Sequence, residues 1–445
     1  MKTPILDFVK SYGESGVSRL HMPGHKGKDF LGLEKYDITE IDGADILYSA
    51  NGIIKESENN ASKLFGSAAT FYSTEGSTLC IKAMLSLICK GKKEKPLILA
   101  ARNVHKAFIY AAVLIDFDIE WMYESEGDHL CSCVLTSQEV EEYILNCDKK
   151  PDAVYITSPD YLGKMWDIKA LAELCDRYDI PLLVDNAHGA YLAFTEEGNH
   201  PIKLGATMCC DSAHKTLPVL TGGAYLHIGE KGRIFIPLAE ECLSLHASTS
   251  PSYLIMQSLD LCNRYLDDGY AEKLSATVSK VNLLKEKLQS LDFDVKESEP
   301  LKLTVSPLSA GLTGNELGSY LLKDGISCEF CDSEFTVMMF TPENSDTDFE
   351  KILSAFSLLR KKEAISLDRT PYMLKAERVL TPRQAFFSES ELISTDDAEG
   401  RICAMPTVSC PPAVPVTVSG ELITAKAIEI FKSYDINKIS VIKIK

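Results

Sequence analysis

Two segments of the sequence contain an apolar, strand-like run that is followed by residues capable of taking part in chemistry. The segment CCDSAHKTLPVLTGGAYL places Lys215 directly after such a run, and IPLLVDNAHGAY ends a similar run at Asp185. A lysine in that position can be desolvated, which favours the neutral amine that attacks an aldehyde. A buried carboxylate can pair with the protonated ring nitrogen of an aromatic cofactor. Taken singly, a solvated surface lysine and a helix-capping aspartate explain these two residues as well.

Two further segments could hold other parts of the same cofactor. In TFYSTEGSTLCIKAML a small-residue turn leads into an amphipathic helix, where Gly76, Ser77 and Thr78 could present N–H groups and hydroxyls to an anion. In ARNVHKAF, His105 follows a strand-like run and could lie flat on a ring. Each pattern is common by itself, so their weight comes from their occurrence together with Lys215 and Asp185.

The sequence around these residues predicts an α/β domain. From about residue 60 to 230, helical patterns alternate with short apolar runs, which is typical of a parallel sheet with crossover helices. Ligands of such sheets bind at the carboxyl ends of the strands, where Ser158, Asp185 and Ser212 follow apolar runs. From about Tyr270, a long amphipathic helix leads into a smaller α+β pattern. The proline-rich SCPPAVPV then indicates a third unit.

Composition excludes some classes of protein. The chain has 445 residues and a net charge of −18, which argues against a nucleic-acid or acidic-membrane surface and tolerates a cationic substrate. The first residues lack a signal-peptide pattern and no run is long enough to span a membrane, so we expect a cytoplasmic enzyme. Close cysteine pairs, Cys131 with Cys133 and Cys328 with Cys331, lack a second pair at zinc spacing. We therefore expect reduced thiols and no metal.

With these residues assembled, the chain resembles the Orn/Lys/Arg decarboxylases of the bacterial type, which are fold-type I enzymes dependent on pyridoxal 5'-phosphate (PLP). The resemblance rests on SAHKTLP and DNAHGA at their spacing and on HMPGHKG, DITEIDGADIL, FGSAATFYSTEGST, RNVHKA, TSPDYLG, STSPSY, PRQAFF and CPPAVPVTVSGE. These motifs extend over nearly the whole chain, and HMPGHKG marks the decarboxylase branch.

The resemblance implies a fold class and a domain plan. We expect an α/β large domain of the fold-type I PLP-dependent transferase type with a mainly parallel sheet, plus smaller α+β domains toward the C-terminus. Residues 1–55 would contribute to the active site and the dimer, and 56–270 would bind PLP. Residues 271–365 would form the small α+β domain and 366–445 the decarboxylase-specific domain. A receiver-like N-terminal domain is not expected.

The resemblance also implies roles for individual residues. Lys215 would form the Schiff base with PLP, Asp185 would pair with the pyridine nitrogen and His105 would stack on the ring. Ala187 and His188 would line the other face of the ring or the substrate side, with His188 a candidate for proton transfer. The residues expected at the cofactor phosphate or ring edge are Gly76, Ser77, Thr78, Ser212 and His214.

Further residues are implied for the subunit interface and the substrate. Ser248 and Thr249, in STSPSY, would reach the cofactor phosphate of a neighbouring subunit, so we expect a homodimer or a higher homo-oligomer with shared active sites. His25, Cys410 and Glu421 are weaker candidates for binding the substrate.

The chain departs from the family's usual pattern at four positions. Glu75 stands where Asn is frequent, Asn186 where an acidic residue is frequent, Ala107 where Ser is frequent and Cys410 where an aromatic residue is usual. These departures put the fine tuning of the site and the substrate pocket in doubt.

The activity implied by the resemblance is decarboxylation of a basic L-amino acid that feeds polyamine metabolism. Arginine or lysine is favoured as the substrate and ornithine is possible. An alternative is another fold-type I PLP enzyme, such as a lyase or an aminotransferase. An aminotransferase typically needs an arginine fork for the retained carboxylate, and Arg383 and Arg401 are the tail arginines near recognised motifs. A catalytically silent PLP-binding homologue is the third possibility.

Overall fold

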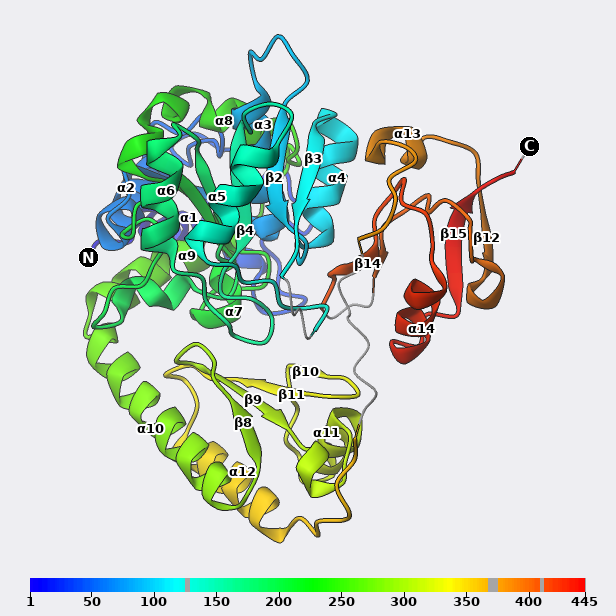
Figure 1. Ribbon diagram of the computed structural model, residues 1–445. Helices are drawn as coiled ribbons and strands as arrows, with labels where there is room; N and C mark the ends of the chain where they lie inside the picture. The colour runs from blue at the N-terminus through cyan, green and yellow to red at the C-terminus, as the bar shows by residue number, and fades with distance from the viewer. Residues whose placement is uncertain (125–128, 367–374, 409–411, 445) are drawn as a thin grey trace. The chain divides into compact units, whose positions relative to one another are not determined.

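The computed structural model describes residues 1–124, 129–366, 375–408 and 412–444 (Figure 1). No helix among these residues is long and apolar enough to cross a membrane. The chain divides into two compact units with their own internal contacts. The first unit comprises Met1–Gly91, Asp152–Tyr155 and Ile168–Lys273, and the second comprises Lys92–Pro151, Ile156–Asp167 and Leu274–Lys445.

A seven-stranded, mainly parallel sheet confirms the predicted α/β class. Its strand order is β1-β7-β6-β5-β4-β2-β3. Strands β5 and β6 pair in parallel, as do β2 and β3, whereas β7 runs antiparallel to both β1 and β6. The strands are β1 (Ala69–Ser73), β2 (Leu97–Ala101), β3 (Asp118–Met122), β4 (Ala153–Thr157), β5 (Leu182–Asp185), β6 (Met208–Asp211) and β7 (Ala224–Ile228).

Strands β5 and β6 carry the predicted chemistry to one edge of the sheet. Their sequences, LLVD and MCCD, are buried at every position, as expected for central strands covered on both faces. In the parallel register Asp185 lies opposite Cys210, so the two strands end side by side. The loops that follow Asp185 and Asp211 therefore start from neighbouring points at the carboxyl edge.

Two glycines shape the turn that leads into α3 (Gly76–Cys89). Gly76 has a φ of +71° and Gly222 a φ of +98°, and residues other than glycine rarely adopt this backbone conformation. The Gly76 N–H donates to the Gly222 carbonyl over 2.7 Å, and a Cβ at Gly222 would lie 2.9 Å from the Thr74 carbonyl oxygen. This close approach fixes where the first turn of α3 begins.

A buried carboxylate ties the N-terminal helix of the first unit to its core. The helix α1 (Pro4–Glu14) has no side-chain cap of its own, and its N–H groups at Ile5 and Leu6 donate to Asp260 over 3.0 Å each. Ser57 donates to the other carboxylate oxygen of Asp260. Burial raises the pKa of Asp260 to about 6. The helices of this unit also include α2 (Ile53–Phe65), α6 (Ile168–Arg177), α7 (Ala213–Thr216), α8 (Ile236–Ser244) and α9 (Tyr253–Asp267).

The second unit contains a small antiparallel sheet in the order β10-β11-β9-β8, which confirms the predicted α+β pattern. Leu303 and Val305 of this sheet pack in one apolar cluster with Val281, Leu317 and Phe356 of the covering helices. The elements are α10 (Tyr270–Ser290), β8 (Asp294–Lys296), β9 (Lys302–Ser306), α11 (Gly314–Lys323), β10 (Phe330–Cys331), β11 (Thr336–Met339) and α12 (Asp346–Leu358).

The last part of the second unit contains two pairs of antiparallel strands. Strand β12 (Ser390–Ser394) pairs antiparallel with β15 (Lys438–Ile442), and β13 (Thr407–Val408) pairs with β14 (Pro415–Thr417). Phe431 of α14 is buried in the cluster that these strands form. The remaining helices of the unit are α4 (Lys106–Ile115), α5 (Ser137–Asn146), α13 (Pro382–Phe386) and α14 (Ala425–Ser433).

Candidate active site

Lys215 and His188 meet in the first unit. Lys215 lies on α7, a four-residue helix that starts two residues after β6, and His188 lies in the turn that follows β5. The Lys215 Nζ is 2.9 Å from the His188 Nε2. His188 is buried, with only 4 % of its surface exposed. The parallel ends of β5 and β6 therefore bring an amine and an imidazole within proton-transfer distance.

Asp185 is a buried carboxylate at the same edge of the sheet. Its Oδ1 accepts from the Ala187 N–H at 3.2 Å and from the Cys210 thiol at 3.6 Å, and its Oδ2 accepts from the Tyr155 hydroxyl at 3.3 Å. Burial raises the pKa of Asp185, while the positive charge of Lys215 opposes that rise. Such a carboxylate gains stability from any further cation placed beside it.

A pair of hydroxyls marks the start of α3. Ser212, which precedes α7, donates through its Oγ to the Ser77 Oγ at 2.8 Å. His214 donates from Nδ1 to the Gly223 carbonyl at 2.9 Å, and burial lowers the pKa of His214. Ser77 and Thr78 lie in the first turn of α3, where N–H groups without helical partners favour an anion.

A fully buried network, which sequence reasoning missed, lies behind Asp185. The Asp211 carboxylate accepts from His200 at 3.0 Å, from His227 at 3.2 Å and from the Asn186 side-chain amide at 2.7 Å. Burial disfavours the charge of Asp211, but the two histidines hold its pKa well below the usual range. Asn186 follows Asp185 directly, so this network holds the end of β5. The sequence did offer one sign of Asp211: the apolar run MCCD ends in Asp, just as LLVD ends in Asp185.

The same contact explains a departure from the family pattern. The Asn186 amide donates to a carboxylate that stays ionised, so an acidic side chain in its place would set two negative charges together in the interior. Asn186 and Asp211 are both fully buried. The amide is therefore suited to this position because it can donate where a carboxylate could not.

His105 belongs to the second unit. It caps α4, because its Nδ1 accepts from the Ala107 backbone N–H at 3.1 Å. That bond uses only the backbone of residue 107, so it is available to Ala as much as to Ser. Stacking of His105 on the cofactor ring stays a prediction.

Glu421 also lies in the second unit, in a buried ion pair that the sequence did not reveal. Its Oε2 is 3.3 Å from the Arg102 guanidinium and accepts from the Val418 N–H at 2.7 Å. Burial raises the pKa of Glu421, and Arg102 opposes that rise. Arg102 also donates to the carbonyls of Pro415 and Val416. A substrate role for Glu421 stays a prediction, and the predicted Cys410 falls outside the described residues.

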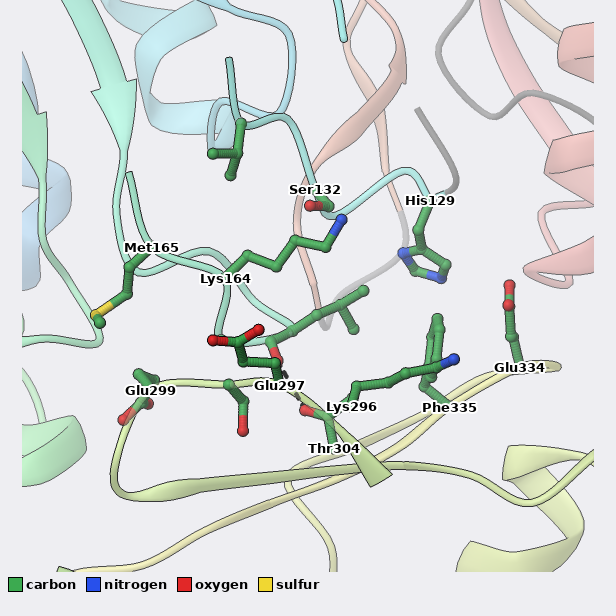
Figure 2. Close-up of a pocket in the computed structure, with 14 residues that line it drawn as sticks. His129, Ser132, Lys164, Met165, Lys296, Glu297, Glu299, Thr304, Glu334 and Phe335 are labelled. Carbon is green, nitrogen blue, oxygen red and sulfur yellow. Dashed lines mark hydrogen bonds between the residues drawn. The ribbon is translucent and has the colours of Figure 1, made fainter. Parts of the chain in front are cut away.

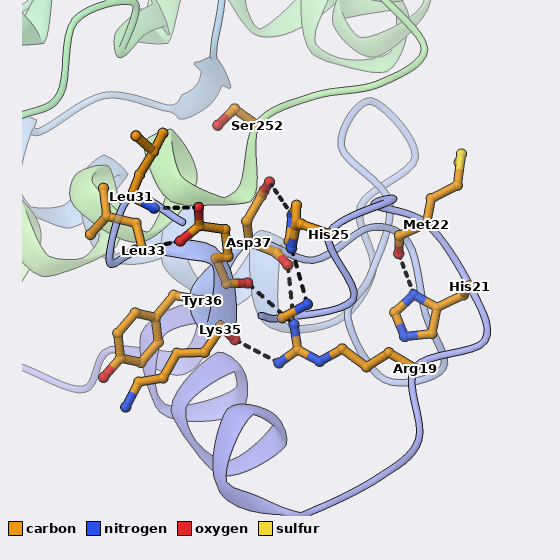
Figure 3. Close-up of polar contacts among 12 residues, drawn as sticks. Arg19, His21, Met22, His25, Leu31, Leu33, Lys35, Tyr36, Asp37 and Ser252 are labelled. Carbon is orange, nitrogen blue, oxygen red and sulfur yellow. Dashed lines mark hydrogen bonds and ion pairs between the residues drawn. The ribbon is translucent and has the colours of Figure 1, made fainter. Parts of the chain in front are cut away.

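His25 belongs to an N-terminal segment held by polar contacts (Figure 3). Its Nδ1 accepts from the Gly27 N–H at 3.0 Å and its Nε2 is 3.2 Å from an Asp37 carboxylate oxygen. Because Nδ1 accepts, Nε2 carries the proton and donates to Asp37. Arg19 donates to carbonyls of the same segment, including that of Lys35 at 2.6 Å.

Ser248 and Thr249 are exposed in the loop that follows α8. The Ser248 N–H donates to the Glu75 carboxylate at 2.7 Å. Glu75, where Asn is frequent in the family, directly precedes Gly76 and so anchors the Ser248 loop to the start of α3.

A cavity of about 460 Å³ lies within the second unit and was not anticipated from the sequence (Figure 2). Lys164 lines it from the loop after β4, and Lys296 and Glu334 line it from the small sheet. The buried Glu299 in its wall is 3.5 Å from the Lys302 ammonium. The wall of the cavity thus carries both positive and negative side chains. None of the residues predicted to bind PLP lines it.

Comparison with known proteins gives matches along almost the entire chain. A model described as Orn/Lys/Arg decarboxylase, major domain, matches residues 3–307, and one described as the C-terminal domain of that family matches residues 366–436. An arginine decarboxylase of Bacillus subtilis is 29% identical, covering 98% of this chain and 94% of its own. One of Halalkalibacterium halodurans is 27% identical over 95% of this chain and 91% of its own.

Solved structures support the same fold. The lysine decarboxylase LdcF of Francisella novicida superposes with a TM-score of 0.83 at 17% identity, covering 99% of this chain and 81% of that one. The constitutive lysine decarboxylase of Escherichia coli superposes with a TM-score of 0.79 at 18% identity, covering 99% and 82%. At these identities the likeness concerns the fold.

Replacing Asn186 by Asp tests the buried network. Asn186→Asp places a second carboxylate against Asp211, which should cost on the order of 3 kcal/mol of unfolding free energy near neutral pH. One carboxyl of the pair would then have a raised pKa, so the lost stability should return as the pH falls and that group takes up a proton. Thermal unfolding of both proteins across that pH range measures the effect.

Asn186→Ala is the matched control, because it removes the hydrogen bond without adding a charge. Its loss, about 1–3 kcal/mol, should not vary with pH relative to the parent. Equal stability of the Asp and Ala variants at every pH would show that Asn186 does not face an ionised Asp211.

Proposed function

The chain belongs to the Orn/Lys/Arg decarboxylase family, whose members decarboxylate basic amino acids with PLP, and we propose that its own substrate is L-arginine and its product agmatine. The observation that carries the choice of substrate is similarity over nearly full length to proteins named arginine decarboxylase. The lysine decarboxylase structures are less than 20% identical and bear on the fold alone. We propose further that the product feeds polyamine formation. The cytoplasmic location stays a prediction.

The described residues offer a suitable group for each part of PLP. The aldehyde would bond the Lys215 amine, and the pyridine nitrogen would face Asp185. Ser77, Ser212 and the N-terminus of α3 would hold the phosphate, which these hydroxyls and N–H groups suit chemically. The buried, hydrogen-bonded carboxylate of Asp185 supports the assignment, because it would gain a cationic partner from a protonated pyridine.

The protein's own residues then have separable tasks. When bound, PLP draws electrons away from the bonds at the substrate's Cα, which allows the carboxylate to leave as carbon dioxide. With PLP bound, Asp185 would hold the proton on the pyridine nitrogen. His188 can exchange a proton with Lys215 across 2.9 Å, so that the amine is neutral when it bonds carbon. The same two groups are the candidates to deliver a proton to Cα after carbon dioxide leaves.

The tail arginines argue against an aminotransferase. Arg383 donates to the Val113 carbonyl at 2.8 Å, and Arg401 donates to Glu391 at 2.7 Å. Both guanidinium groups therefore already serve structural contacts. An aminotransferase would need a guanidinium directed at the substrate carboxylate, which that reaction retains.

We also propose that the active form is a homodimer that covers an apolar patch on the N-terminal segment. Several large side chains there are strongly exposed: Leu20 by 94%, Phe30 by 76% and Leu31 by 89%. Arg19 donates to three backbone carbonyls of this segment, and Glu34 accepts from the Leu31 N–H at 2.6 Å (Figure 3). The patch is thus presented on a fixed backbone, as expected of an interface rather than a frayed end.

A panel assay tests the substrate. The purified protein supplied with PLP is incubated separately with arginine, lysine and ornithine, and carbon dioxide and the amine products are measured. We expect agmatine with carbon dioxide from arginine and at least about tenfold lower kcat/KM on the other two, the scale of a difference of about 1.4 kcal/mol in transition-state binding.

Two variants accompany the panel. Lys215→Ala should abolish turnover, whereas Lys90→Ala, which removes a surface lysine paired with Glu241, should not change it. Preference for lysine or ornithine would overturn the choice of arginine. A 2-oxo acid without carbon dioxide would instead favour the aminotransferase reading.

Light scattering coupled to gel filtration tests the dimer. The double variant Phe30→Asp with Leu31→Asp adds charges to the proposed interface and should shift the protein from dimer to monomer and lower its activity. Leu358→Asp, at the end of α12, is the control: Leu358 is 76% exposed, as Phe30 is, and this variant should stay dimeric. A parent protein that elutes as a monomer, or a double variant that remains dimeric, would contradict the proposal.

A further inference from the structure

Tyr155 contacts Asp185 from the neighbouring strand of the seven-stranded sheet. It lies in β4, which is next to β5 in the strand order, and its side chain is fully buried. Its hydroxyl donates to the Asp185 Oδ2 at 3.3 Å. Because a buried hydroxyl without a hydrogen-bond partner costs free energy, this contact makes a tyrosine acceptable in a central strand.

The three hydrogen bonds to Asp185 differ in kind. Oδ1 accepts from the Ala187 backbone N–H and from the Cys210 thiol, whereas Oδ2 accepts from the Tyr155 hydroxyl. A thiol is a weak donor, and this sulfur lies 3.6 Å from the carboxylate oxygen. Tyr155 is therefore the stronger of these two side-chain donors. Because donors reach both oxygens, they also fix the plane of the carboxylate.

The hydroxyl and the carboxylate influence each other's ionisation. Burial and the nearby charge of Asp185 raise the pKa of Tyr155 well above its usual value, so the hydroxyl keeps its proton and stays a donor. Burial also raises the pKa of Asp185, and the hydrogen bond from Tyr155 opposes that rise. Tyr155 thus stabilises the charged form of Asp185 over the pH range in which Asp185 titrates.

We propose that Tyr155 is a positioning residue for the decarboxylation: by stabilising the charge of Asp185, its hydroxyl holds the shared proton on the pyridine nitrogen of bound PLP rather than on the carboxylate. This role rests on the proposed function, because the carboxylate and the ring share a proton only if PLP binds beside Asp185. A donor to the carboxylate favours the charged pair over the neutral one. Since the protonated ring is the stronger electron acceptor, Tyr155 supports the reaction through Asp185.

The other groups around Asp185 do not obscure this effect. The charged and titratable side chains that face it come from four elements: Tyr155 on β4, Cys209 and Cys210 on β6, Lys215 on α7 and Cys80 on α3. Burial raises the pKa of all three thiols, so they stay protonated from neutral pH downward. The positive charge of Lys215 acts on Asp185 in the parent protein and in a Tyr155 variant alike.

Urea unfolding of the protein without PLP tests the first half of the proposal. Tyr155→Phe removes the donor and keeps the ring, so the pKa of Asp185, obtained from the pH dependence of unfolding, should rise by about one unit. The variant should therefore unfold at lower urea than the parent near neutral pH. The difference should shrink as the pH falls and the carboxylate takes up a proton, because the neutral acid depends less on the donor.

Tyr253→Phe is the matched control. Tyr253 is also fully buried in the first unit, but its hydroxyl donates to the Asp45 backbone carbonyl at 2.7 Å, an acceptor that does not titrate. Its loss of stability should not vary with pH. An equally constant loss in Tyr155→Phe would overturn the proposal, whether or not the protein decarboxylates arginine.

Nuclear magnetic resonance of PLP labelled with ¹⁵N in its ring tests the second half. In the parent holoenzyme the ring nitrogen should show the chemical shift of a protonated pyridine, and in Tyr155→Phe that shift should move toward the neutral form. On arginine, kcat should fall about tenfold while KM changes little. A ring-nitrogen shift that is the same in both proteins would overturn the proposal. A parent that binds PLP in this way but releases no carbon dioxide from basic amino acids would refute the decarboxylation alone.

Discussion

The site depends on keeping a carboxylate charged where burial disfavours the charge. Asp185 is 2% exposed at the end of a central strand, and three hydrogen bonds together with the positive charge of Lys215 oppose the effect of burial on its pKa. A protonated pyridine ring would complete this balance, because it is a cation that the buried carboxylate can stabilise. The proposed chemistry follows from the same requirement, since the protonated ring is the stronger electron acceptor.

The elements around Asp185 make that arrangement rigid. Parallel pairing of β5 with β6 sets Asp185 beside Cys210, and the Asp211 network holds Asn186, the next residue, through a buried amide. On the other side, the close approach of Gly76 to Gly222 fixes the start of α3 and with it Ser77. Preorganised groups of this kind need little rearrangement when a ligand binds.

The sequence predicted the parts of the structure that depend on local patterns. Alternating apolar runs and helical periods were sufficient for the α/β class, and the polar ends of LLVD and MCCD located Asp185 and Lys215. The pairs Asn186 with Asp211 and Arg102 with Glu421 could not be predicted, because their members are 25 and 319 residues apart and meet only through the fold. The cavity beside Lys164 could not be predicted either, because the residues that line it come from segments that are far apart in the sequence.

Borohydride reduction of the protein after incubation with PLP tests the central claim most directly. Reduction makes the bond between the cofactor and its lysine permanent, and peptide mapping then identifies the lysine. Attachment at Lys215, lost in Lys215→Ala, is the result expected if this amine and Asp185 face opposite ends of one ring. Attachment at a different lysine, or none in a protein that still decarboxylates arginine, would contradict it.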